Sequence, residues 1–202
     1  MALPATGVIS AAFCAFLEPN RPVRATHSPK IKAAKRPEKE ISDMSTLQDT
    51  FKSAMRRLAA TVNVITCESE GSRYGITATA VTSLSADPQS LLVCVNRGSS
   101  ICPIITERRA FCVNILGAHH VEISRAFGGA SPASERFLTG DWAETEDGLP
   151  LLLDAQASLI CELDNTVSYG THNVFFGRVR DIKLSGDIRP LIYGDGRYCQ
   201  VA

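Results

Sequence analysis

Residues 75–106 read GITATAVTSLSADPQSLLVCVNRGSSICPIIT, and this stretch carries the strongest structural pattern in the chain. Small and β-branched side chains alternate from Thr77 to Ser83, which predicts a strand. These side chains are too small to fill a core alone, so the strand leaves room for a flat group against its backbone. After a turn at residues 86–89, an apolar run over residues 91–96 predicts a second, buried strand.

The turn after the second strand has the composition of an anion site. Arg97, Gly98, Ser99 and Ser100 precede a short helical pattern. Free backbone N–H groups and the helix dipole favour an anion at such a helix start. The alternative is that Ser99 only caps the helix, as serine often does.

Composition limits the classes of protein and of site. The chain has 202 residues and is 45% hydrophobic, which predicts one domain with a full core and a tail. Lys plus Arg and Asp plus Glu are equal at 21 each, so no net field indicates a nucleic-acid or membrane partner. The cysteines form no CxxC pair and no metal-type cluster with histidine, so we predict no metal site and a reducing, cytoplasmic location.

Residues 1–44 differ from the rest of the chain. A short apolar run over residues 8–17 is followed by sequence rich in Pro, Lys and Arg. A transit peptide is one interpretation, because the segment is basic and poor in acids. We favour a disordered extension, or a start codon assigned too early with Met44 as the alternative start. The domain is then predicted to span residues 45–202 and to begin with a helix.

The remaining sequence predicts many strands and few helices. Strand patterns cover residues 61–66, 110–116, 155–163, 172–184 and 191–201, and a helix pattern covers residues 118–127. His119 and His120 are adjacent on that helix, so we expect them to point apart and to form no metal site. No strand alternates with a long helix, and the pattern therefore favours a closed antiparallel barrel over a parallel sheet.

Several of these residues match a known family in order along the chain. They are Thr77–Val81, Ser83–Ser85, Pro88, the apolar strand to Asn96, and Ser99–Ser100. The sequence from Phe51 to Ala202 resembles the flavin reductase family, and within it the NAD(P)H:flavin oxidoreductases of two-component monooxygenases, such as the reductase of 4-hydroxyphenylacetate 3-monooxygenase. The resemblance implies a mainly β fold, a six-stranded antiparallel Greek-key split β-barrel with a few flanking helices, and a homodimer.

The resemblance also implies where FMN, or alternatively FAD, is held. The flavin ring would lie against the backbone of Thr77, Ala78, Thr79, Ala80 and Val81. Backbone N–H groups of this strand would meet the ring edge where negative charge grows on reduction. The phosphate would be held by Arg97, Ser99 and Ser100, with Asn96 and Ser83 beside them.

A second cluster, Gly170-Thr171-His172, resembles the Gly-Asp-His motif of flavin reductases. Thr171 stands where many members have Asp, which removes a carboxylate. The resemblance implies that His172 positions NADH or NADPH for hydride transfer to the flavin. Such a reaction needs no acid–base dyad, because the flavin and the nicotinamide hold the redox chemistry. The alternative is a turn histidine at the start of a strand.

Three further residues follow from the resemblance. Arg197 and Tyr198 lie in the sequence YGDGRY, residues 193–198, which in this family is near the nucleotide. The Gly-Asp-Gly sequence also predicts a β-turn, and the two interpretations are compatible. Phe137 is a candidate lid over the active site or, together with Trp142, an anchor of a loop onto the barrel.

These features predict an NAD(P)H-dependent flavin reductase that releases reduced flavin to a separate flavin-dependent monooxygenase. An electron-transfer or non-catalytic FMN-binding protein of the same fold is the alternative, although His172 would then have no nicotinamide to position. A pyridoxamine-phosphate oxidase-like enzyme ranks lower, because the phosphate segment lacks the Arg and Lys richness that its ligand favours.

Overall fold

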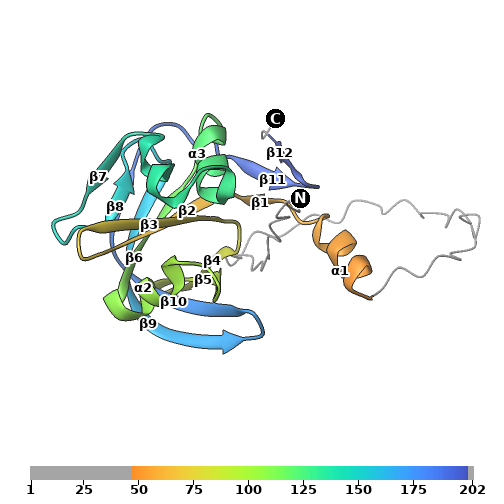
Figure 1. Ribbon diagram of the computed structural model, residues 1–202, viewed down its shortest axis with the longest axis horizontal. Coiled ribbons are helices and arrows are strands. Elements are labelled where there is room, and N and C mark those ends of the chain that lie inside the picture. The colour runs from red at the N-terminus through yellow and green to blue at the C-terminus, as the bar shows by residue number, and fades with distance from the viewer. Residues whose placement is uncertain (1–46, 200–202) are drawn as a thin grey trace, which may run out of the picture.

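The computed structural model describes residues 47–199. The prediction for residues 1–44 lies outside the described residues, as do both ends of the predicted domain. The described chain is mainly β with a few short helices, as predicted (Figure 1). The helices are α1 (Leu47–Met55), α2 (Ile101–Arg108), α3 (Val121–Arg125), a π-helical turn η1 (Ala126–Ala130) and a 3-10 helix η2 (Ala133–Leu138). Within residues 47–199 no helix is both long and apolar enough to cross a membrane.

The strands form a main sheet and two small ones, and all strand pairs are antiparallel. The main sheet has seven strands in the order β3-β2-β6-β9-β10-β5-β4. Its strands are β2 (Asn63–Ser69), β3 (Ser72–Ala78), β4 (Val81–Ala86), β5 (Gln89–Asn96), β6 (Ala110–Ile115), β9 (Ala157–Tyr169) and β10 (His172–Leu184). The small sheets are formed by β1 (Ala60–Thr61), β11 (Ile192–Gly194) and β12 (Arg197–Cys199), and by β7 (Trp142–Glu144) and β8 (Pro150–Leu152).

One continuous stretch of chain supplies both outer strands of the main sheet. Strands β3 and β4 stand at opposite ends of the strand order, yet only Thr79 and Ala80 separate them in sequence. At this bend the N–H of Val81 donates to the carbonyl of Thr79 at 2.9 Å, and the carbonyl of Ala80 accepts from Cys94 at 3.0 Å. The bend divides the predicted strand in two, and the main sheet therefore has seven strands where six were predicted. The strand order of the described residues runs from β3 to β4 without closing, so the predicted closed barrel is not confirmed.

The larger buried apolar cluster joins the main sheet to α2. Phe111 of β6 and Phe175 of β10 are its largest fully buried side chains, and Ile101 and Ile105 of α2 pack into it. Burying a side chain of this size contributes about 1.5–3 kcal/mol relative to leaving it exposed. Gly177 makes room for the packing, since a Cβ atom there would lie 2.6 Å from Cζ of Phe111.

A fully buried amide ties four strands together. The side-chain N–H₂ group of Asn114 donates to the carbonyl of Val64 at 3.1 Å and to Oγ1 of Thr66 at 3.2 Å. Its oxygen accepts from the backbone N–H of Leu152 and from Oγ of Ser158, both at 2.9 Å. A buried polar group costs free energy unless it is hydrogen-bonded, so this arrangement specifies how β2, β6, β8 and β9 fit together.

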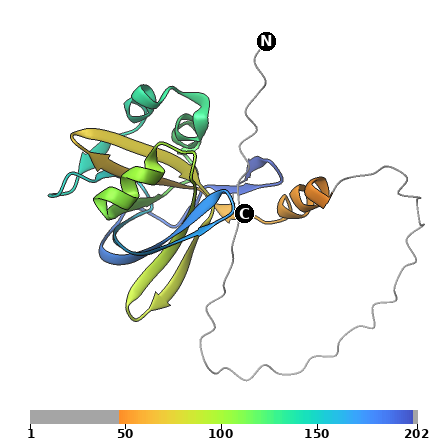
Figure 2. The same cartoon turned by 60° about the horizontal axis from the view of Figure 1, so that its bottom comes forward.

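The second apolar cluster holds α3 and η1 over the β2–β3 hairpin (Figure 2). Val62, Leu116, Leu152 and Leu191 are buried in it together with Phe127 of η1. A Cβ atom at Gly75 of β3 would lie 2.4 Å from the ring of Phe127, so a glycine is needed for this close approach. The cluster thereby positions the helical segment beside β3.

The predicted strand over residues 191–201 is instead a hairpin. Strands β11 and β12 pair Tyr193 with Tyr198, and Asp195 and Gly196 between them have φ of 49° and 76°. Positive φ at both central residues is typical of a type I′ hairpin turn, so the β-turn prediction is confirmed. The helix predicted at the start of the domain is confirmed as α1, which has no buried residues and projects from the body (Figure 1).

Every cysteine among the described residues is a free thiol. The apolar strand patterns predict four core cysteines, and three of them, Cys67, Cys112 and Cys161, are buried in the main core, whereas Cys94 is only half-buried. Burial raises the pKa of Cys67 and of Cys161 to about 12, and it also raises that of Cys112. These thiols therefore stay protonated at neutral pH.

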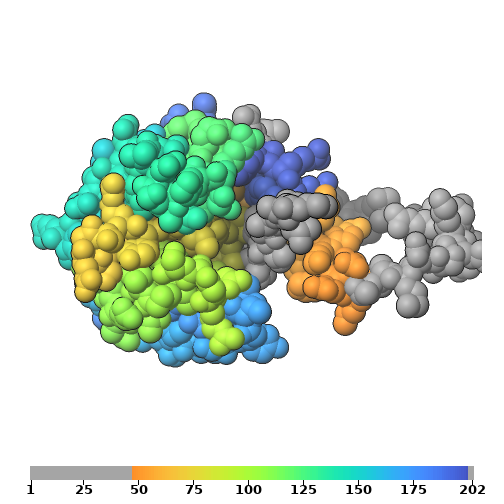
Figure 3. All heavy atoms as spheres, viewed as in Figure 1, coloured from red at the N-terminus to blue at the C-terminus, as the bar shows by residue number. Residues whose placement is uncertain are grey.

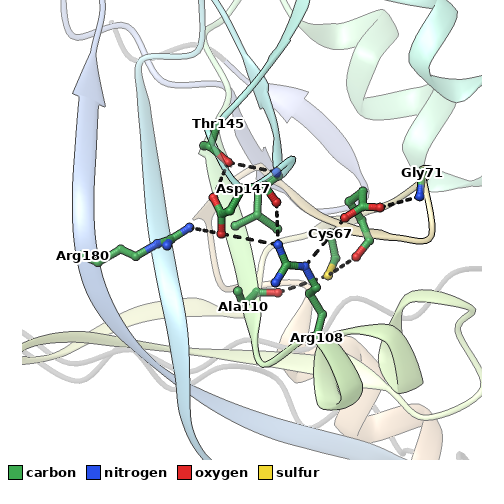
Figure 4. A network of polar contacts seen from close by, with 9 residues as sticks. Cys67, Gly71, Arg108, Ala110, Thr145, Asp147 and Arg180 are labelled. Atoms are coloured by element: carbon green, nitrogen blue, oxygen red, sulfur yellow. Dashed lines mark hydrogen bonds and ion pairs between the residues drawn. The ribbon is translucent and has the colours of Figure 1, made fainter.

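A charged network connects the turn over residues 145–149 to α2 and β10 (Figure 4). The carboxylate of Asp147 accepts hydrogen bonds from Oγ1 of Thr145 at 2.7 Å and from Nη2 of Arg180 at 2.5 Å, and Nη2 of Arg108 lies 3.5 Å away. Burial alone would raise the pKa of Asp147, but the hydrogen bonds from Thr145 and Arg180 outweigh it and lower that pKa. The ionised carboxylate therefore stabilises the fold.

Replacing Asp147 should cost stability in a pH-dependent way. Asp147→Asn is expected to lower the free energy of unfolding by about 1 kcal/mol at neutral pH, because it removes a charged acceptor from a partly buried network. The contribution of Asp147 is present above its unfolded pKa, about 3.9, and is lost as the pH falls through its lower folded pKa. Urea unfolding at about pH 7 and about pH 3 should therefore show the two proteins converging in acid.

The control for this prediction is Asp181→Asn. Asp181 pairs with Lys183 at 2.9 Å, but both side chains are more than half exposed, at 52% and 62%. Such pairs contribute little, so the control should match the wild type at both pH values. A deficit of Asp147→Asn that persisted in acid would contradict the role assigned to the carboxylate.

Candidate functional site

Several of the predicted site residues line one cavity of about 720 Å³. They come from three distant parts of the chain: Thr77 in β3 and Thr79 just after it, Asn96 at the end of β5 with Ser99 and Ser100 in the β5–α2 turn, and Tyr198 in β12. The alternation of side-chain direction along β3 explains which of the predicted flavin-strand residues line the cavity. Thr77 and Thr79 face the cavity, whereas Ala78 packs against the main core and Ala80 is buried.

The hydroxyl of Thr79 is a buried polar group without a partner among the described residues. Thr79 is only 5% exposed, and its Oγ1 has no hydrogen bond. The neighbouring Thr77, in contrast, donates from Oγ1 to the carbonyl of Ser124 at 2.7 Å. An unsatisfied buried hydroxyl is costly, and here it belongs to a residue that lines the cavity. The cavity therefore fits a ligand that brings a polar edge to this strand.

The β5–α2 turn presents small polar groups at the start of a helix. Oδ1 of Asn96 accepts from the N–H of Gly98 at 2.8 Å, and Oγ of Ser99 donates to the carbonyl of Asn96 at 2.6 Å. Helix α2 begins after Ser100, whose side chain makes no capping hydrogen bond. The alternative that Ser99 caps the helix is therefore wrong. Ser100 and the first N–H groups of α2 lie where an anion is favoured.

His172 lies next to this turn although 76 positions separate it from Asn96 in the sequence. The β10–β5 ladder pairs His172 with Asn96, and the N–H of Arg97 donates to the carbonyl of Thr171 at 3.0 Å. Oγ1 of Thr171 is 2.9 Å from Nδ1 of His172. The hydroxyl of Thr171 thus contacts the imidazole through Nδ1. His172 lies beside the turn but is not among the residues that line the cavity, so its assignment stays a prediction.

The other predicted site residues lie outside this cavity. Val81 and Ser83 line a second, apolar groove of about 780 Å³, which Thr79 also lines. Arg97 is exposed, and Arg197 lines a separate pocket against α1 that contains Arg56. Their assignments therefore stay predictions.

Phe137 packs in an aromatic cluster. Its ring centroid lies 4.9 Å from that of Phe127 and 5.0 Å from that of Trp142, and the guanidinium of Arg73 lies 4.7 Å from it. Edge-to-face contacts of this kind hold η2 against η1 and β7. This packing favours the anchor interpretation of Phe137 over the lid.

The wall that α3, η1 and η2 contribute to the cavity was not predicted. Ser124, Arg125, Gly128, Gly129 and Arg136 line it, in a region predicted only as a helix and its break. Oγ of Ser124 is 2.9 Å from the hydroxyl of Tyr198, which joins this wall to the C-terminal hairpin. The Gly128-Gly129 pair was the available signal, because adjacent glycines leave a backbone open to a ligand.

His119 and His120 do not point apart, contrary to the prediction. His120 precedes α3 with φ −87° and ψ 27°, so the helical angle between neighbours does not apply. The ring centroids are 3.8 Å apart, and both Nε2 atoms lie within 3.2 Å of Oδ2 of Asp154. Nδ1 of His120 accepts from the N–H of Gly117, and burial lowers the pKa of His120. The neutral ring therefore carries its proton on Nε2 and offers a metal no lone pair there.

The chain is similar to known proteins in both sequence and structure. The chain matches the flavin reductase like domain over residues 55–202. FMN reductase (NADH) RutF of Variovorax paradoxus (strain S110) is 43% identical over 152 residues, which cover 75% of this chain and 84% of that protein. A nitrilotriacetate monooxygenase component B homolog from Mycobacterium thermoresistibile superposes with a TM-score of 0.73 at 29% identity, covering 77% of this chain and 87% of that one.

A second solved structure shows the same fold with ligands. NADH:FAD oxidoreductase SgcE6 of Streptomyces globisporus C-1027, in complex with NAD and FAD fragments, superposes with a TM-score of 0.72 at 26% identity and covers 80% of this chain and 98% of that one. The sequence match extends from the end of α1 through the predicted flavin strand and the His172 motif to the C-terminus. The chain therefore belongs to the family of flavin reductase like domains.

Proposed function

We propose that this protein is an NADH-dependent flavin reductase with FMN as its flavin. The observation that carries the proposal is the juxtaposition of the two predicted motifs. The β5–α2 turn that lines the cavity pairs directly with the His172 motif through the β10–β5 ladder. Membership of the family and similarity to a protein named FMN reductase (NADH) support the same activity.

Different residues are proposed to bind different parts of the flavin and of the nicotinamide nucleotide. Thr77 and Thr79 line the wall that the flavin ring would contact, and the free hydroxyl of Thr79 meets its polar edge. Asn96, Ser99 and Ser100 form the phosphate end at the start of α2. His172 orients the nicotinamide, which supplies a hydride to the flavin. Holding two reactants in contact is the main catalytic contribution expected of the protein.

We also propose that reduced flavin leaves for a separate monooxygenase. The support is the structural neighbour that is named as component B of nitrilotriacetate monooxygenase. The free thiols of the described cysteines fit a reducing, cytoplasmic compartment. If residues 72–86 are counted as one strand bent at Thr79 and Ala80, the strand order agrees with the six-stranded split barrel that the family resemblance implies.

The electron-transfer alternative is less well supported. A protein that only binds FMN has no use for a nicotinamide position. Here Thr171 holds the ring of His172 by a contact of 2.9 Å, beside the turn that lines the cavity. The pairing of an oriented imidazole with a phosphate-binding turn favours a reductase.

NADH oxidation at about 340 nm tests the activity. The rate should rise and saturate as FMN is added. His172→Ala should lower kcat/KM for NADH by about tenfold or more and change the FMN dissociation constant by less than about twofold, because the histidine acts on the nicotinamide. Retained yellow FMN without NADH or NADPH oxidation would instead favour the electron-transfer protein.

Thr79→Val separates flavin binding from folding. In the free protein the substitution removes an unsatisfied hydroxyl, so thermal stability should be unchanged or higher. The dissociation constant for FMN should rise by about 3- to 10-fold, equivalent to about 1 kcal/mol, because the ligand loses a hydrogen bond. Thr106→Val on α2, outside the cavity, is the control and should bind FMN normally. Fluorescence titration of FMN measures both, and equal affinities would remove Thr79 from the site.

The second groove is our proposed homodimer interface. It is mainly apolar, and Ile182, Leu184 and Ile188 on its rim are 47%, 79% and 93% exposed. A second copy of the chain is the proposed occupant, because the family resemblance implies a homodimer with flavin near the subunit interface, and Thr79 lines both this groove and the cavity. Leu184→Glu should shift the protein toward monomer in light scattering after gel filtration. Leu138→Glu, equally exposed at 80% but outside the groove, should not.

A further inference from the structure

Arg136 is a cation without a counter-ion among the described residues. Its Nη1 donates to the carbonyl of Gly75 at 2.9 Å, and its Nε lies 3.5 Å from the carbonyl of Ser131. No carboxylate lies within ion-pair distance of it in residues 47–199. A guanidinium has five N–H donors, so a donor fork remains uncommitted. Arg136 is half-buried on the cavity wall, where its charge is only partly screened.

The charged side chains that line the described part of the cavity are all positive. Among the described residues that line it there are two arginines and no aspartate or glutamate. The other arginine, Arg125, is neutralised by Glu122, whose Oε1 accepts from its Nη1 at 2.7 Å. Arg136 therefore gives the cavity an uncompensated positive charge, and that charge favours an anionic ligand group.

The element that carries this charge lies apart from the turn predicted to hold the flavin phosphate. The β5–α2 turn and the α3–η2 segment lie on opposite sides of the β2–β3 hairpin (Figures 1 and 2), and β3 lies between their surfaces in the space-filling view (Figure 3). A single phosphate at Ser99 and Ser100 would leave Arg136 without a partner. Two anion-favouring positions in one cavity fit two phosphate-bearing groups.

The wall beside Arg136 is open to a bulky anion. Gly129 has φ of 107°, which other residues rarely adopt, and a Cβ atom there would meet nothing within 4 Å. At Gly128 the nearest atoms, on Thr77, would be 4.0 Å away. The bare backbone of η1 thus lets a large group approach the guanidinium, whose planar fork matches phosphate oxygens.

We propose that Arg136 binds the pyrophosphate of a dinucleotide, which in the proposed reaction is NADH. The inference deepens the proposed function and rests on it for the identity of the ligand. FAD carries the same pyrophosphate group, so the shared chemistry is a diphosphate linkage and the experiment distinguishes the two sources. Arg136 acts in binding, since its bonds anchor the guanidinium beside β3 and leave the fork for the ligand.

The test compares Arg136→Gln with Arg136→Lys and with the control Arg125→Gln. Arg136→Gln should raise the KM for NADH about 10- to 100-fold with kcat nearly unchanged, because a charge-assisted hydrogen bond to the ground state and transition state alike is lost. Arg136→Lys should recover part of the loss through its charge. Neither variant should change the KM for FMN, which has no pyrophosphate. Arg125→Gln should change the KM for NADH far less.

A binding measurement keeps the inference independent of turnover. Sodium pyrophosphate should raise the melting temperature of the wild type and compete with NADH, and both effects should vanish in Arg136→Gln. If wild type oxidised no NADH, the proposed function would fail, yet pyrophosphate binding would still report on Arg136. A loss confined to FAD would assign the diphosphate to the flavin and support the shared chemistry. Pyrophosphate stabilising both proteins equally, or an equal loss for FMN and NADH, would overturn the role of Arg136.

Discussion

A single bend at Thr79 and Ala80 is the constraint on which the rest of the structure depends. Because β3 pairs with β2 and β4 pairs with β5, hydrogen-bonded ladders fix the chain on both sides of the bend. The bend places Thr79 on the cavity and on the apolar groove at once. Ligand binding and subunit contact, as proposed here, would therefore act on the same residue and stabilise the same local conformation.

The second constraint is the antiparallel pairing of Asn96 in β5 with His172 in β10. The sequence does not indicate that these two residues are neighbours, but antiparallel pairing brings the end of β5 to the start of β10. A rigid sheet positions such groups better than two loops would, because backbone hydrogen bonds hold the strands along their whole length. The proposed phosphate and nicotinamide positions thus have a fixed geometry before any ligand arrives.

Local patterns predicted the parts of the fold that depend on local chemistry. Strand β10 spans His172–Leu184, the predicted range, and the alternation from Thr77 to Ser83 predicted strand structure there. Which of the five residues Thr77–Val81 line the cavity was not predicted; among them Thr77 and Thr79 do. One error arose where a distant contact decides, because His120 turns toward Asp154 before its helix begins. The Ser99 cap, an alternative left open, fails for a local reason, since Oγ of Ser99 bonds back to the carbonyl of Asn96 three residues earlier. The uncompensated charge of Arg136 could not be predicted from the sequence, since the lack of a carboxylate partner among the described residues is a property of the folded cavity.

The buried thiols of the core have a consequence for the chemical durability of the protein. Cysteine is oxidised through its thiolate, and access by the oxidant is required as well. Cys67 and Cys161, with pKa values of about 12, hold almost no thiolate at neutral pH and are closed to solvent. The main sheet can therefore carry these buried sulfur atoms without accumulating sulfenic acid there, which would suit the proposed role of supplying reduced flavin to an oxygen-using partner.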